Sequence, residues 1–181
     1  GDVWVNDHVA FRTFDLPGMT RLELGRPFEA LGYVLQKDDM IFTEKKLVAN
    51  FWLHPDPKMP KVFISELRTE LVSQPLQDWI RHVTEPFYVN GLKPSLELFL
   101  SPTWNPVKFS DFQRFYAESE YAAWTAAFGI QVNHYTVLVN ELKSLIFELI
   151  ETFDKTSRSS KARSAKIYFA LPAAELNSLA D

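Results

Sequence analysis

Apolar and polar residues alternate at the start of the chain with the period of two that is typical of β-strands. Over residues 3–14, His8 and Arg12 fall on one face of this segment. Val9 and Phe11 fall on the opposite face. The segment is therefore predicted to be a strand that carries His8 and Arg12 on the same side.

A short helix and a series of strands are predicted next. Pro17-Gly18 ends the first strand, Thr20 is available as a helix cap, and apolar residues at helical spacing lead to a stop at Gly32. Four strand-like runs follow, separated by polar and Pro-rich segments: Tyr33–Leu35, Met40–Thr43, Lys46–Leu53 and Val62–Leu67. The predicted order is one strand, one helix and then several strands.

Helical spacing returns in the middle of the chain. It covers Gln77–Phe87 and Phe109–Phe128, and Gly129 stands where the second of these helices would end. A strand at Ile130–Asn140 and an amphipathic helix at Glu141–Phe153 come next. Since the strand-then-helix order begins again here, two similar modules are implied, with a helical connector between them.

Each of these modules places a histidine soon after an asparagine at the start of its strand. His8 follows Asn6, and His134 follows Asn133. Taken singly, each histidine is better explained as a half-buried side chain whose ring nitrogens bond to neighbouring backbone. At equivalent positions of two modules, however, the two rings can face one cleft, and neutral imidazole is a common ligand of divalent metals.

The other candidate polar residues have competing explanations. Arg12 can reach a substrate carboxylate near His8, or it can be a surface residue in an ordinary ion pair. Glu66 can be a third metal ligand, or it can pair with Arg68 or Lys61. His54, in a Pro-bounded turn, and His82, on the polar side of a helix, are read as surface residues without a role.

Composition removes several classes of function. The chain of 181 residues has a formal net charge of -4, which disfavours nucleic acid and anionic membranes as partners. It has no Cys, so a metal site must use His, Asp and Glu, and a cytoplasmic location is expected. No window is long and apolar enough to span a membrane, and no phosphate loop, nucleophile elbow or dinucleotide fingerprint is present.

Four segments together resemble the 2-oxoadipate dioxygenase/decarboxylases, which are also called hydroxyglutarate synthases. These segments are Asp7–Phe14, Lys61–Leu67, Tyr116–Trp124 and Val132–Val137. The resemblance runs from about residue 3 to residue 153. It implies an α+β fold with two βαβββ-like modules that form a vicinal-oxygen-chelate-like half-barrel with additional helices. Within one domain, 1–181, it implies a first module at 1–75, a helical connector at 76–129 and an incomplete second module at 130–181.

The same resemblance implies a mononuclear Fe(II) held by two His and one Glu. His8 and His134 match the two histidines, and Arg12 matches the arginine that binds the substrate carboxylate. The expected activity is oxidative decarboxylation of a 2-oxo dicarboxylic acid, 2-oxoadipate plus O2 giving 2-hydroxyglutarate and CO2, a reaction of lysine catabolism. The matching Glu is expected beyond Asp181.

Within the chain, Glu66 and Glu175 are only weak substitutes for that third ligand. Two other functions therefore stay open: a metal-dependent hydrolase, isomerase or lyase on the same scaffold, and a metal-free binding protein or inactive remnant.

Overall fold

The computed structural model of the chain describes residues 5–138. Residues His8–Tyr135 form one compact unit, which is described here by itself, and the remaining residues belong to a second unit. The helices and strands run in the order β1 (Asn6–Phe14), α1 (Arg21–Glu29), β2 (Val34–Leu35), β3 (Met40–Phe42), β4 (Leu47–Leu53), β5 (Lys61–Leu67), η1 (Thr69–Leu71), α2 (Gln74–Val89), η2 (Glu97–Leu100), α3 (Phe109–Tyr116), α4 (Glu120–Phe128) and β6 (Val132–Val137).

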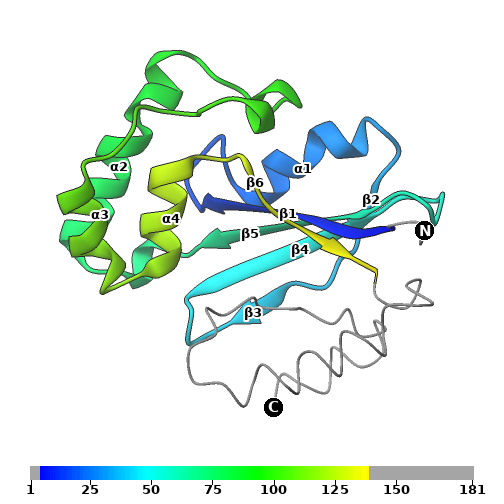
Figure 1. Cartoon of the computed structure of the whole chain (residues 1–181), viewed down its shortest axis with the longest axis horizontal. Helices are drawn as coiled ribbons and strands as arrows, with labels where there is room; N and C mark the ends of the chain where they lie inside the picture. The colour runs from blue at the N-terminus through cyan, green and yellow to red at the C-terminus, as the bar shows by residue number, and fades with distance from the viewer. Residues whose placement is uncertain (1–4, 139–181) are drawn as a thin grey trace, which may run out of the picture. The chain divides into compact units, whose positions relative to one another are not determined.

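The described strands form one mixed sheet, and β1 lies inside it. The strand order is β2-β4-β5-β1-β6, with β3 also paired to β4 (Figure 1). Strand β1 runs parallel to β5, while β4 runs antiparallel to β5. The first strand therefore has a neighbour on each side, and one of these neighbours, β6, comes from the far end of the described chain.

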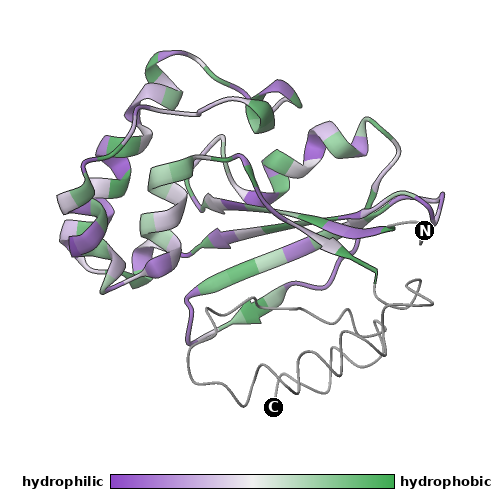
Figure 2. Cartoon of the chain, viewed as in Figure 1, coloured by the Kyte–Doolittle hydropathy of each residue, from purple (hydrophilic) through white to green (hydrophobic). Residues whose placement is uncertain are grey.

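The pairing register sorts the side chains of the sheet onto two faces. Val9 and Phe11 share a face with their β5 partners Val62 and Ile64, and all four are buried. Helix α1 covers this face, as its contacts with β4 and β5 show. Figure 2 shows the strands mixing apolar and polar positions along their length. The other face carries His8 and Arg12, which are only half-buried.

Helix α1 begins and packs as its sequence dictates. Thr20 and Glu23 form a capping box, in which each side chain bonds to the backbone N–H of the other residue. Gly25 lies against the indole of Trp52 on β4, so closely that a Cβ atom on residue 25 would stand 2.1 Å from Trp52 Cζ2. The helix therefore approaches the sheet at a distance that only glycine allows.

Helices α2, α3 and α4 gather beside the carboxyl ends of β1 and β5 (Figure 1). Trp79 of α2 stacks on Phe115 of α3, with ring centroids 4.6 Å apart. Gly129 ends α4 with a φ of 73°, and a Cβ there would meet Thr103 Oγ1 at 2.7 Å. This tight turn sends the chain from α4 into β6. Within residues 5–138, no helix is long and apolar enough to cross a membrane.

Most of the predicted elements are confirmed, with one clear exception. The segment Phe109–Phe128, predicted to be a single helix, is divided into α3 and α4. Ser119 accepts a hydrogen bond from the backbone N–H of Ala122 and so caps the start of α4. The predicted helix at Glu141–Phe153 lies outside the described residues, and the division into two modules and a connector stays a prediction.

We expect the substitution Gly25→Ala to lower the free energy of unfolding by about 1–3 kcal/mol, because the added methyl group overpacks the contact with Trp52. At an exposed helix position the same change would raise stability by about 1 kcal/mol through helix propensity. Urea unfolding measures the difference. In a Trp52→Phe background, Gly25→Ala should lower the free energy of unfolding by less, because the indole atoms that contact residue 25 are absent. A stabilising effect of Gly25→Ala in the native background would contradict this packing.

Candidate functional site

The structure brings His8 and His134 together. His8 projects from β1 and His134 from β6, which are neighbours in the sheet. Their ring centroids are 5.6 Å apart, and the ring planes meet at 76°. His8 also lies near the ring of Phe63 on β5, at a centroid distance of 6.4 Å. Two imidazoles that are far apart in sequence therefore meet on one face of the sheet.

The surroundings of His134 favour its neutral form. Partial desolvation of the ring lowers the pKa of His134, and the nearby charges of His8 and Arg12 lower it further. The Nδ1 atom of His134 lies 2.8 Å from Oδ1 of Asn133. Because an amide oxygen only accepts hydrogen bonds, this contact favours the tautomer with the proton on Nδ1. That is the protonation state in which histidine binds a metal.

Arg12 lies on the same face as His8. It pairs with Ser65 of β5, and its guanidinium Cζ atom stands 5.1 Å from the ring centroid of Tyr121 on α4. Beside it is a cavity of about 240 Å³. The cavity wall includes Arg12, Trp124, Thr125, Phe128, Gln131 and Asn133. A cationic group thus faces a small cavity with aromatic and amide walls, a suitable setting for an organic acid.

The two histidines fit a divalent cation as part of a ligand set. A metal about 2.1 Å from one nitrogen of each imidazole places the ring centroids about 5 Å apart, close to the distance observed. Imidazole nitrogen suits iron, zinc and other first-row metals. Among residues 5–138, however, no group of three His, Cys, Asp or Glu side chains is arranged to hold a metal. A third protein ligand would have to come from outside the described residues.

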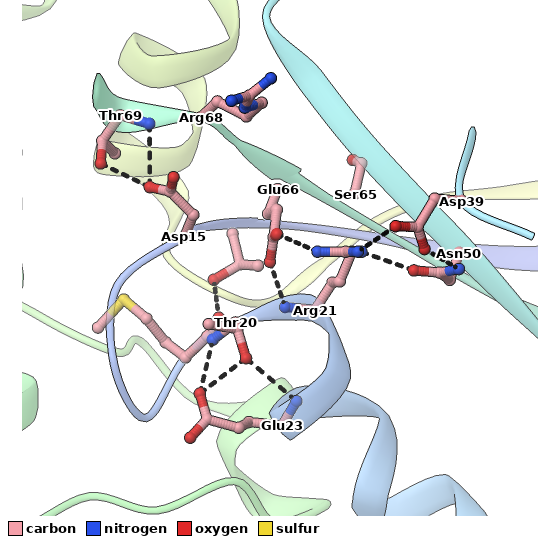
Figure 3. Close-up of polar contacts among 12 residues, drawn as sticks. Asp15, Thr20, Arg21, Glu23, Asp39, Asn50, Ser65, Glu66, Arg68 and Thr69 are labelled. Atoms are coloured by element: carbon pink, nitrogen blue, oxygen red, sulfur yellow. Dashed lines mark hydrogen bonds and ion pairs between the residues drawn. The ribbon is translucent and has the colours of Figure 1, made fainter. Parts of the chain in front are cut away.

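Glu66 is not that third ligand in this structure, which corrects one of the sequence-based alternatives. Glu66 pairs with Thr13 of β1, so it lies on the face opposite His8 and Arg12. Its carboxylate accepts a hydrogen bond from the backbone N–H of Arg21 at 2.7 Å and forms an ion pair with the Arg21 guanidinium (Figure 3). The predicted partners were Lys61 and Arg68, but the pairing strands bring Arg21 of α1 to this carboxylate instead.

The ion pair of Glu66 and Arg21 is part of a buried polar network. The two side chains are 7% and 13% exposed. Arg21 also donates to Asn50 at 2.6 Å and to Asp39 at 3.0 Å (Figure 3). Burial raises the pKa of Glu66, although the bonds and charge of Arg21 oppose that rise. The network fastens α1 to β4 and β5, so the role of Glu66 is structural.

His54 and His82 lie away from the pair formed by His8 and His134. His54 packs on the ring of Tyr33 at 5.1 Å and accepts a hydrogen bond from the backbone N–H of Asp56. His82 is exposed at a shallow depression on α2. His82 lies at the surface, as predicted, whereas His54 is half-buried. That neither residue has a functional role stays a prediction. Glu175 lies outside the described residues.

Sequence reasoning missed Tyr121, Trp124 and Phe128 as neighbours of Arg12. Their helical spacing indicated an aromatic face that packs in a core, and nothing in that pattern tells which strand the face meets. One sequence signal did point to this region: the family resemblance covers Tyr116–Trp124, a segment that includes Tyr121 and Trp124.

Curated relatives confirm the resemblance noted in the sequence. The chain is 38% identical over 151 residues to the 2-oxoadipate dioxygenase/decarboxylase, chloroplastic, of Arabidopsis thaliana, covering 76% of this chain. It is 33% identical over 161 residues to the chloroplastic/amyloplastic protein of the same name from Oryza sativa subsp. japonica, covering 80% of this chain. Over the matched residues, the chain is a relative of the 2-oxoadipate dioxygenase/decarboxylases. It spans 40% and 44% of the length of these two relatives, and no family model matches it.

Solved structures with the same fold include a member of this enzyme family. A hydroxyglutarate synthase from Oryza sativa in complex with 2-oxoadipate has a TM-score of 0.73 and 31% identity, covering 89% of this chain and 55% of its own. A Shewanella frigidimarina NCIMB 400 protein described as a hydrolase has a TM-score of 0.75 and 36% identity, covering 84% of this chain and 60% of its own.

A third solved structure bears on the fold alone. A glyoxalase-superfamily protein from Ralstonia eutropha JMP134 has a TM-score of 0.67 at 19% identity, covering 85% of this chain and 56% of its own. The predicted α+β, vicinal-oxygen-chelate-like fold class is confirmed by these likenesses and by the mixed sheet with its helices.

The prediction of a cytoplasmic location is wrong. Both curated 2-oxoadipate dioxygenase/decarboxylases are named as plastid proteins, chloroplastic in one case and chloroplastic/amyloplastic in the other. The prediction depended on the absence of Cys. That feature concerns disulfides, and it does not distinguish one reducing compartment from another.

We expect Glu66→Gln to lower the free energy of unfolding by about 3 kcal/mol, because Arg21 loses its buried counter-charge and keeps only the half-exposed carboxylate of Asp39. Metal affinity should stay unchanged, because Glu66 faces away from the histidines. Denaturant unfolding and anaerobic metal titration measure the two effects. The matched control is Glu70→Gln, which removes the exposed ion pair with Arg68 and should cost less than about 1 kcal/mol. Weaker metal binding with unchanged stability would instead make Glu66 a ligand.

Proposed function

We propose that the protein carrying this chain is an Fe(II)-dependent dioxygenase/decarboxylase that acts on a 2-oxo dicarboxylic acid. The observation that carries this proposal is the placement of the His8 and His134 rings 5.6 Å apart, with Arg12 on the same face of the sheet, in a relative of the 2-oxoadipate enzymes. The substrate class follows from the 2-oxoadipate that is bound in the related rice enzyme. The balanced reaction consumes one 2-oxoadipate and one O2 and yields one 2-hydroxyglutarate and one CO2.

In this proposal, His8 and His134 supply two of three protein ligands to the iron. The third, a Glu, comes from outside the described residues. When bound, Fe(II) in such a two-His, one-carboxylate set supplies the electrons for O2 activation and open positions for a chelating 2-oxo acid. The contact of His134 Nδ1 with Asn133 orients the ring and favours the tautomer in which Nε2 is the basic nitrogen.

Arg12 binds the distal carboxylate of the substrate. Its planar guanidinium donates two parallel hydrogen bonds to a carboxylate, which favours a dicarboxylic over a monocarboxylic acid. Arg12 is four residues beyond His8 on β1, roughly 13 Å along the strand, and its long side chain shortens that separation. A substrate whose 2-oxo end lies at the histidines would direct its other carboxylate toward Arg12.

The cavity beside Arg12 suits the methylene chain between these two ends. Trp124 and Phe128 stack with ring centroids 4.4 Å apart and form its apolar wall. Contact with these rings removes water from the methylene groups of the substrate, and the amides of Gln131 and Asn133 offer hydrogen bonds near the polar ends. The substrate is thereby oriented between two fixed ends.

The activity is tested with protein prepared without oxygen and loaded with Fe(II). Addition of 2-oxoadipate and O2 should give equal amounts of consumed O2 and released CO2, and the activity should vanish on chelation. Turnover that depends on a metal but consumes no O2 would replace this proposal with a hydrolase or lyase, in keeping with the description of the Shewanella structure. Absence of metal binding would indicate a metal-free binding protein.

We expect Arg12→Ala to raise the KM for 2-oxoadipate by about 10²-fold, since a charge-assisted bidentate contact is lost. Iron content should change little, because Arg12 is not a ligand. Steady-state kinetics and metal analysis of the same preparation give both numbers. Arg114, whose guanidinium packs on Phe115 instead, provides a matched Arg→Ala control that should leave KM unchanged. Equal losses of substrate and iron binding in Arg12→Ala would make Arg12 a structural residue.

A further inference from the structure

We propose that Tyr121 is a positioning residue that holds Arg12 in place for the substrate carboxylate. Under the proposed function, Tyr121 itself binds neither the metal nor the substrate. It rests on the proposed function for the role of Arg12. The placement of the Arg12 guanidinium by Tyr121, however, can be measured without any turnover.

The hydroxyl group of Tyr121 ties α4 to the strand pair that carries Arg12. It accepts a hydrogen bond from the backbone N–H of Thr13 at 3.1 Å and donates one to the carbonyl oxygen of Ser65 at 2.7 Å. The Ser65 hydroxyl lies a further 3.0 Å away. Ser65 is the β5 partner of Arg12, and Thr13 is the next residue of β1. The phenol oxygen thus spans β1 and β5 where Arg12 leaves the sheet.

The ring of Tyr121 supports the side chain that it anchors. The Arg12 Cζ atom stands 5.1 Å from the ring centroid, within the range of a cation–π contact. A contact with an aromatic ring does not use the N–H donors of a guanidinium, so they remain able to bind a carboxylate. Burial strongly raises the pKa of the Tyr121 phenol, so the group stays protonated and continues to donate to Ser65. The neutral ring and its fixed hydroxyl act together on Arg12.

Helix α4 couples this anchor to the cavity wall. Tyr121 lies in the first turn of α4, and Thr125 donates to the Tyr121 carbonyl at 2.8 Å. Trp124 and Phe128 of the same helix line the cavity beside Arg12. Fixing Tyr121 to β1 and β5 therefore sets the distance between the cation and the apolar wall. A tyrosine that merely filled the core would require neither the cross-strand hydrogen bonds nor the cation–π contact with Arg12.

Two substitutions separate the ring from the hydroxyl. Tyr121→Leu removes both and should raise the KM for 2-oxoadipate about tenfold, the size of one cation–π contact together with its anchor. Tyr121→Phe keeps the ring and should raise it only about threefold. For 2-oxohexanoate, which has the same chain length but no distal carboxylate, KM should not change in either variant. The affinity for Fe(II) should also be unchanged.

The control is Trp79→Leu, which removes a stacked aromatic side chain of α2 away from the cavity. It should lower the unfolding temperature as the Tyr121 variants do but leave KM for 2-oxoadipate unchanged. A parallel rise of KM for both substrates in Tyr121→Leu, or an unchanged KM in a folded Tyr121→Leu protein, would overturn the proposal.

Positioning is also measured directly, by the ¹⁵N–¹H resonance of Arg12 Nε–H and its heteronuclear NOE. In the native protein and in Tyr121→Phe this group should be ordered and shifted by the ring current of residue 121. In Tyr121→Leu both signatures should be lost. If they are lost in a protein that turns over no 2-oxo acid, the positioning role stands and the proposed function fails. If Arg12 stays ordered in Tyr121→Leu, the positioning role is overturned whatever the activity.

Discussion

Strand β1 pairs with β5 on one side and β6 on the other, and the described site depends on these two pairings. The pairing with β6 sets the ring of His134 beside that of His8. The parallel pairing with β5 sets Arg12 level with Ser65, the residue to which Tyr121 is bonded. A shift of one residue in either register would turn these side chains to the opposite face.

The alternation along β1 also separates two different uses of charge. On the face under α1, Glu66 and Arg21 neutralise each other in a buried network and hold the helix to the sheet. On the other face, His8, His134 and Arg12 are less buried, and Arg12 lines a cavity. One face therefore fastens α1 to the sheet, and the other carries His8, His134 and the cationic Arg12.

The elements that were predicted correctly from the sequence are those that local residue patterns determine. The period of two located β1 with its two faces, Thr20 located the start of α1, and Gly129 located the end of α4. The side of the sheet that Glu66 occupies was not predictable, because it depends on the register between strands separated by most of a module. The approach of Tyr121 to Arg12 has the same origin, since it joins a strand and a helix more than a hundred residues apart.

The central claim is that His8 and His134 bind one metal ion together, and a crystal structure of the protein grown with Fe(II) in the absence of oxygen tests it most directly. Anomalous scattering recorded on both sides of the iron absorption edge identifies the ion without reference to activity. The account predicts a single iron peak within bonding distance of one nitrogen of each ring. An iron peak elsewhere, or His8 and His134 rings turned away from a common centre in such crystals, would contradict it.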